Sequence, residues 1–119
     1  MSHPIEGVWA VETKYDDRPR TDRGTILFHP EGTVSIAFSE YAAHAVWQTT
    51  GEGKVAVTGT RPVGPNEGFI GWFTLKGLGE VSDDGVTLSM KALQTRPRPD
   101  GSMVEQRATI TGTRVLVAS

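Results

Sequence analysis

Short β-rich runs separated by turn signals are the feature that most constrains what this chain can fold into. Its 14 glycines and 7 prolines supply most of the turns. Turns every eight to twelve residues or so are typical of all-β domains. We expect strands at residues 8–13, 24–28, 33–38, 45–50, 54–60, 69–76, 78–81, 86–94 and 103–115.

The order of these runs predicts an antiparallel up-and-down meander. His29-Pro30-Glu31-Gly32 and Gly51-Glu52-Gly53 are turn sequences that join neighbouring runs as hairpins. An open sheet of this many short strands exposes two edges, and closing it into a barrel removes both. We therefore expect one all-β domain, residues 1–119, folded as an antiparallel barrel of about eight to nine strands. A two-sheet sandwich is the alternative.

Two segments interrupt the pattern of strands. Residues 39–44 have the composition of a short helical turn with Ser39 as its cap, and we expect a lid or corner there. Residues 62–68 contain two prolines, which are expected to end the ladder of strand pairing. The second segment is therefore predicted to be the longest irregular loop.

The composition argues against several classes of partner. A net charge of -2, with both signs spread along the chain, leaves no basic surface for nucleic acid. The densest cationic stretch, with Arg96 and Arg98, is predicted to be a solvated turn rather than an anion site. No cysteine is present for a disulfide or a thiolate site, and no apolar run approaches the roughly 18 residues of a membrane span. The first residues lack a targeting pattern, so we expect a cytoplasmic protein with no nucleic-acid or membrane partner.

Both ends of the chain resemble the lipocalin pattern. Gly7-Val8-Trp9 is similar to the lipocalin Gly-x-Trp, which places its tryptophan across the closed end of the barrel, and Arg114 stands where lipocalins have an arginine packed on that ring. The resemblance implies that Trp9 and Arg114 form a structural pair. A guanidinium on an indole face gains cation–π attraction and still donates hydrogen bonds.

The resemblance extends to small lipocalin-like, calycin-type barrel proteins of actinobacteria, most of which have no assigned function. These proteins also begin with a His-Pro-Leu/Ile-x-Gly-x-Trp phrase, here residues 3–9, and they have segments similar to residues 24–34, 46–51 and 76–88. The similarity covers nearly the whole chain. It implies the fold much more than an activity.

Period-two alternation from Trp9 and Arg114 predicts which side chains face the barrel interior. A ligand pocket is then expected to be shaped by Phe38, Trp47, Phe69, Phe73, Leu88 and Met90. Gln106 is the inward polar residue that would orient a ligand, although a bond to a neighbouring strand explains it equally well. Small and large residues alternate in this set, so the sequence leaves open whether the interior holds a cavity or is filled.

The best acid–base candidates are Tyr41 and His44, at the corner before residue 45, and Tyr15 near the first loop. A structural role for each is the alternative. The chain contains no phosphate-binding or nucleotide-binding motif, and its three histidines lack the spacing of metal ligands. We predict no metal and no cofactor.

Three functions fit these observations. The first is a barrel that binds a compact hydrophobic molecule of secondary metabolism. The second is a cofactor-free cyclase or isomerase that templates a polyketide-like or terpene-like intermediate and assists proton transfer. The third is a filled barrel that associates with itself through exposed aromatics such as Trp72. We expect a monomer or a weak homodimer.

Overall fold

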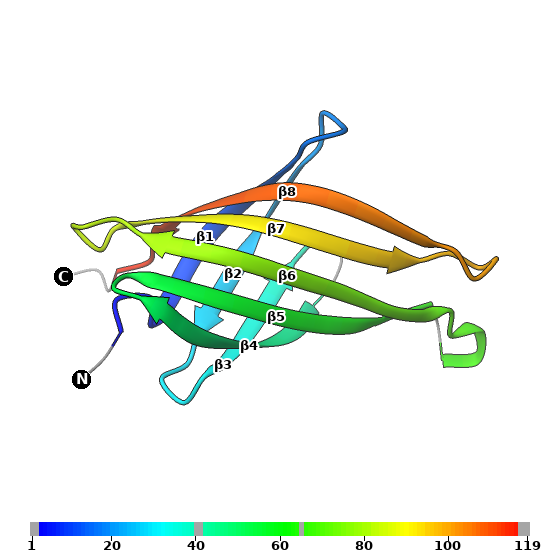
Figure 1. Ribbon diagram of the computed structural model, residues 1–119, viewed down its shortest axis with the longest axis horizontal. Coiled ribbons are helices and arrows are strands. Elements are labelled where there is room, and N and C mark those ends of the chain that lie inside the picture. The colour runs from blue at the N-terminus through cyan, green and yellow to red at the C-terminus, as the bar shows by residue number, and fades with distance from the viewer. Residues whose placement is uncertain (1–2, 40–41, 65, 117–119) are drawn as a thin grey trace.

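The chain folds as one closed barrel of eight antiparallel strands (Figure 1). The computed structural model describes residues 3–39, 42–64 and 66–116. A short 3-10 helix, η1 (Asn66–Gly68), lies between β5 and β6. The strands are β1 (Gly7–Tyr15), β2 (Thr21–Phe28), β3 (Thr33–Phe38), β4 (Ala42–Gly51), β5 (Lys54–Val63), β6 (Gly71–Val81), β7 (Thr87–Pro97) and β8 (Met103–Arg114).

Each strand pairs with the next along the chain, and β1 pairs with β8 to close the sheet. Trp9 lies opposite Arg114 in that closing ladder, so the first and last strands pair near the two ends of the chain. The predicted all-β meander and its closure into a barrel are confirmed, and the sandwich is excluded. Because closure leaves no free edge, every strand has two partners.

The predicted break between residues 69–76 and 78–81 is wrong. β6 runs without interruption through Gly77, which pairs with Val57 on one side and Ala92 on the other. The expected end of the ladder at Pro62 is also wrong, since β5 continues to Val63. The carbonyl of Val63 accepts a hydrogen bond from the amide of Ile70, so the polar backbone groups of Val63 face β6. Those of Pro62 face away from β6, where its missing N–H breaks no bond to that strand.

The predicted corner at residues 39–44 is strand from Ala42 onward, because β4 begins there and pairs with β3. Residues 40 and 41 lie outside the described residues. None of the described residues forms a helix long and apolar enough to cross a membrane.

The two ends of the barrel differ. At the closed end, the start of β1 and the end of β8 lie beside the β6–β7 turn (Figure 1). At the opposite end, which we call the open end, are the β5–β6 and β7–β8 connections, and the β1–β2 hairpin projects from the barrel (Figure 1). The largest fully buried side chains include Ile5, Trp9, Phe28 and Leu88. These pack in the closed half.

Alternation along the strands places the core as predicted at most positions. In β7, for example, Leu88, Met90 and Ala92 are buried and their neighbours are not. The inward prediction for Phe69 is wrong, since its side chain is exposed. Phe69 precedes β6, and its ring meets that of Trp72 edge-on outside the barrel, with the centroids 5.4 Å apart.

Candidate functional site

Arg114 joins several segments of the chain at the closed end of the barrel. Its guanidinium carbon lies 4.4 Å from the centroid of the Trp9 ring, and the indole nitrogen of Trp9 donates to the carbonyl of Ile5 over 2.8 Å. The guanidinium donates to the carbonyls of Gly85 (2.8 Å), Glu6 (2.7 Å) and Pro4. These contacts join the first residues, the β6–β7 turn and the last strand, so the chain itself closes this end of the barrel.

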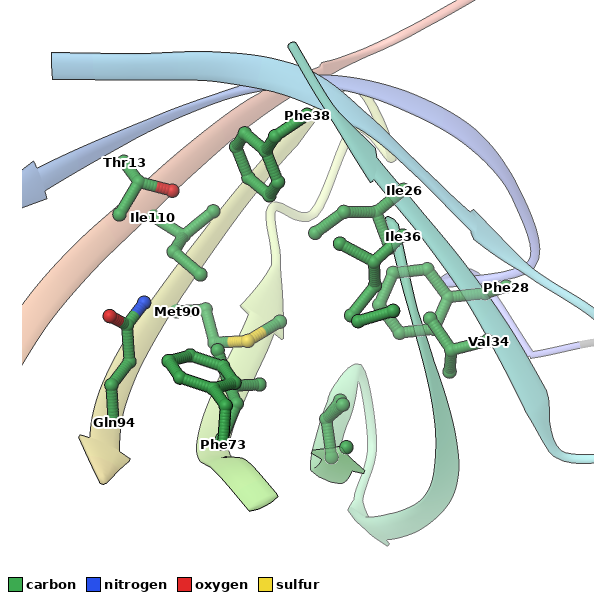
Figure 2. Close-up of a pocket in the computed structure, with 14 residues that line it drawn as sticks. Thr13, Ile26, Phe28, Val34, Ile36, Phe38, Phe73, Met90, Gln94 and Ile110 are labelled. Carbon is green, nitrogen blue, oxygen red and sulfur yellow. The ribbon is translucent and has the colours of Figure 1, made fainter. Parts of the chain in front are cut away.

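The interior above this end is nearly filled. The described residues enclose a small apolar space there, which we call the inner pocket, of about 20 Å³. A space of this size holds about one water molecule. Its walls include residues from all eight strands, and ten of the lining side chains are labelled in Figure 2.

The inner pocket has one polar side. Figure 2 shows Thr13 and Gln94 on one side of the space and Ile26, Ile36 and Phe28 on the other. Thr13 is 2% exposed and Gln94 is 5% exposed. The Thr13 hydroxyl has no hydrogen-bond partner among the described residues, and a buried hydroxyl without a partner is costly.

A much larger space lies across the open end, directly above the inner pocket. This mouth pocket has a volume of about 530 Å³, within the range of about 300 to 1,000 Å³ of small-molecule sites. Phe73 and Gln94 line both spaces, so they form the floor of the mouth pocket. Val63, Ile70 and Val104 add apolar surface to its walls.

Arginines dominate the rim of the mouth pocket. Five arginines line it, together with a single carboxylate, that of Asp22. We call them the mouth arginines: Arg18, Arg20, Arg61, Arg96 and Arg98. Arg18 and Arg20 come from the β1–β2 connection, Arg61 from β5, and the last two from the end of β7 and the turn after it. Three separate parts of the sequence therefore meet here.

Strand register explains why Arg61 and Arg96 face inward. Arg61 pairs with Phe73 across β5 and β6, and Arg96 pairs with Val104 across β7 and β8. Side chains of directly paired residues lie on the same face of a sheet, and Phe73 and Val104 face the pocket. The Arg61 guanidinium carbon lies 4.6 Å from the Phe73 ring centroid.

Tyr15 and Asp22 form a hydrogen-bonded pair in the wall of the mouth pocket. The Tyr15 hydroxyl donates to Oδ2 of Asp22 over 2.6 Å, and Nε of Arg20 donates to Oδ1 over 2.8 Å. Burial pushes the pKa of Asp22 upward, but the bonds from Tyr15 and Arg20 and the positive charge of Arg20 and Arg18 outweigh it. The pKa of Asp22 is therefore lower than usual, and its carboxylate stays ionised at neutral pH.

Gln106 is also part of this wall. Its carboxamide accepts a hydrogen bond from Arg18 over 2.7 Å and donates to Asp17 over 2.8 Å. The Arg18 guanidinium carbon in turn lies 5.2 Å from the centroid of the Tyr15 ring. These contacts tie the β1–β2 connection to β8 and hold one side of the mouth in place.

The predicted pocket residues fall into three groups. Phe38, Phe73 and Met90 line the inner pocket, and Phe73 and Gln106 line the mouth pocket. Leu88 is buried in the closed half, where it pairs with Gly112. Trp47 is half-buried at the closed end, where its indole nitrogen donates to the carbonyl of His29 over 2.8 Å. Phe69 lies outside the barrel.

Of the predicted acid–base residues, Tyr15 and His44 are not brought together. His44 lies on β4 with its side chain exposed, between the buried Ala43 and Ala45, and so faces away from the interior. Tyr15 lines the mouth pocket. Tyr41 lies outside the described residues.

The sequence interpretation did not identify three parts of the site: Gln94, the hydroxyl of Thr13, and the mouth arginines. Period-two alternation along the strands could have identified several of these residues. Extending the inward positions Met90 and Ala92 by two steps leads to Gln94 and Arg96, and extending Val55 and Val57 leads through Gly59 to Arg61. Arg18 and Arg20 lie in a connection, where no periodicity exists.

Comparison with known proteins finds no family model that matches the chain and no curated protein with significant sequence similarity. Within residues 3–39, 42–64 and 66–116, no three histidine, aspartate or glutamate side chains converge to hold a metal ion. The function must therefore be argued from the mouth pocket itself.

Proposed function

We propose that the protein binds a compact hydrophobic small molecule, of the kind made in secondary metabolism, in the mouth pocket. The observation that carries this proposal is a space of about 530 Å³ at the open end of the barrel, above an inner pocket of only about 20 Å³. Apolar burial against Val63, Phe73 and Val104 supplies binding energy, at about 25 cal/mol for each Å² removed from water.

The packing limits how deep this ligand sits. The inner pocket, at about 20 Å³, is too small for anything but water, so the ligand lies across the mouth and rests on Phe73. Gln94 at the floor offers a carboxamide to a ligand carbonyl or hydroxyl. The polar orienting role that the sequence interpretation gave to Gln106 is thus better filled by Gln94, because Gln106 is already bonded to Arg18 and Asp17.

A neutral fluorescent probe, N-phenyl-1-naphthylamine, tests the proposal. We expect saturable binding to the wild-type protein and at least about a tenfold loss of affinity, about 1.4 kcal/mol, for Val104→Trp, which fills the pocket. The matched control is Val46→Trp, on the exposed outer face of β4, which should bind as the wild type does. Equal affinity in the two variants, or no binding at all, would contradict the proposal.

A cofactor-free cyclase or isomerase, acting on a polyketide-like or terpene-like intermediate, is the second candidate. The Tyr15–Asp22 pair favours it, because a phenol that donates to an ionised carboxylate in the pocket wall is able to take up a proton from a bound substrate while it passes its own proton to Asp22. Extracts of small molecules would be incubated either with the wild-type protein or with the Tyr15→Phe variant. The compounds in the two incubations would then be compared by mass spectrometry. A product formed only by the wild type supports catalysis, and identical spectra oppose it.

Kinship with the lipocalin-like proteins of actinobacteria is also a proposal, supported by the closed barrel and by the Trp9–Arg114 contact. The cytoplasmic location, the lack of a cofactor, and the monomeric or weakly dimeric state stay predictions.

A further inference from the structure

We infer that the ligand of the mouth pocket is an organic acid: an apolar body that carries a carboxylate, sulfonate or phosphate bound by Arg61 and Arg96. The inference rests on the proposed function, because it assigns the chemical class of the molecule that the mouth pocket holds.

The rim of the pocket is opposite in charge to the molecule as a whole. The chain carries a net charge of -2, yet the described residues that line the mouth include five arginines and one carboxylate. That carboxylate, of Asp22, is already engaged by Tyr15 and Arg20. Like charges gathered around a concave site with apolar walls raise the local concentration of anions.

Arg61 and Arg96 stand on either side of Phe73. Arg61 is paired with Phe73 across β5 and β6, and Arg96 lies on the neighbouring strand β7, where Thr95 pairs with Thr74. Arg96 forms no ion pair with a carboxylate of the described residues, and its side chain is exposed to the pocket. Two guanidinium groups beside one aromatic ring suit a ligand whose acidic group adjoins an apolar body, because guanidinium binds oxyanions through paired, charge-assisted hydrogen bonds.

The floor supplies the second, independent observation. Gln94, which lines the floor of the mouth pocket, is more than nine-tenths buried. Gln94 faces both the inner and the mouth pocket. A ligand with its acid at the rim and a carbonyl or hydroxyl at its other end would meet both polar zones, with Phe73 and Val104 in contact with its apolar body.

A pair of probes that differ by one sulfonate isolates the contribution of the acid. 8-Anilinonaphthalene-1-sulfonate is N-phenyl-1-naphthylamine with a sulfonate added, so the ratio of their affinities reports recognition of the anion. We expect the wild-type protein to bind the sulfonate at least about ten times more tightly, which corresponds to about 1.4 kcal/mol. In the double variant Arg61→Gln/Arg96→Gln the ratio should fall close to one.

The matched control is Arg23→Gln/Arg107→Gln, which removes the same charge from exposed, outward positions of β2 and β8. It should keep the wild-type ratio. The single variant Arg96→Gln, at an exposed position, should lower the ratio in part and leaves the core intact if the double variant fails to fold.

The outcomes separate the two proposals. Failure of the neutral probe to bind overturns the proposed function. Binding of the neutral probe with no preference for the sulfonate overturns the organic-acid inference alone. A preference that falls equally in both double variants also overturns it, because long-range charge rather than Arg61 and Arg96 would then be responsible.

Discussion

At the scale of single residues, Arg114 combines two roles that are usually separate. Its guanidinium covers the Trp9 ring and also satisfies backbone carbonyls from three segments: Pro4, Glu6 and Gly85. A hydrogen bond to a charged group contributes about 1.5 to 3 kcal/mol, and a desolvated cation–π contact about 2 kcal/mol. Because these partners overlap in space, the contributions do not simply add.

Arg114→Ala should therefore lower the free energy of unfolding by about 2 to 4 kcal/mol. Arg114→Lys should recover only part of this, because an ammonium cannot donate in three fixed directions while lying over an indole. Urea unfolding followed by tryptophan fluorescence measures both. Arg107→Ala, exposed on the same strand, is the control, and an equal loss in that variant would contradict the role of Arg114.

The residues of the candidate site differ in how far the sequence could predict them. Phe73 was predicted to line a pocket from period-two alternation, and it does line one. Arg61 and Arg96 follow the same alternation, but the stretch that contains Arg96 was interpreted as a solvated turn, and no role was predicted for Arg61. Which charged side chains converge depends on how the β1–β2, β5–β6 and β7–β8 connections meet at one end, and this is a property of barrel closure rather than of local sequence.

At the scale of strands, glycine at inward positions lets neighbouring strands and rings approach closely. Gly24 of β2 pairs with Phe38 of β3, and a Cβ on Gly24 would lie 2.7 Å from Cδ1 of the Phe38 ring and would also collide with the carbonyl oxygen of Ala37. The backbone oxygen cannot move without separating the strands. Gly24 therefore makes room for the Phe38 ring that covers the inner pocket.

Gly24→Ala should destabilise the fold by about 1 to 3 kcal/mol, the usual cost of overpacking. Gly51→Ala is a control of identical chemistry, since the nearest atom to its added Cβ is Cδ of Lys54 at 3.8 Å. Its midpoint of thermal unfolding should stay close to that of the wild type. A midpoint for Gly24→Ala that matches the Gly51→Ala value would show that β2 and β3 adapt.

The strands themselves were largely predictable because turn residues punctuate them, as at Gly51-Glu52-Gly53. The errors came from applying local rules to residues whose tertiary context overrides them. Gly77 was predicted to interrupt a strand, but it is paired with Val57 on one side and with Ala92 on the other. Pro62 was predicted to end strand pairing, but its missing N–H faces away from β6. Neither fact can be derived before the register of the neighbouring strands is known.

At the scale of the whole molecule, the barrel is built with one sealed end and one open end. Ile5 and Trp9 are fully buried at the sealed end, whereas Arg96 and Val104 at the open end are exposed or half-buried around the mouth pocket. Local opening requires less free energy where fewer apolar side chains are buried. The stability of the barrel should therefore fall from the sealed end toward the mouth.

Hydrogen exchange measures this gradient along single strands. In β7 and β8, amides of Leu88 and Ile110 should exchange more slowly than those of Arg96 and Val104, by on the order of 100-fold after correction for intrinsic rates. Saturating 8-anilinonaphthalene-1-sulfonate should slow exchange at the mouth and leave the sealed half unchanged, because a ligand stabilises the segments that it contacts. Uniform protection along both strands, or slowing spread evenly over the barrel, would mean that the barrel opens as one unit and that the mouth is not a separately mobile binding surface.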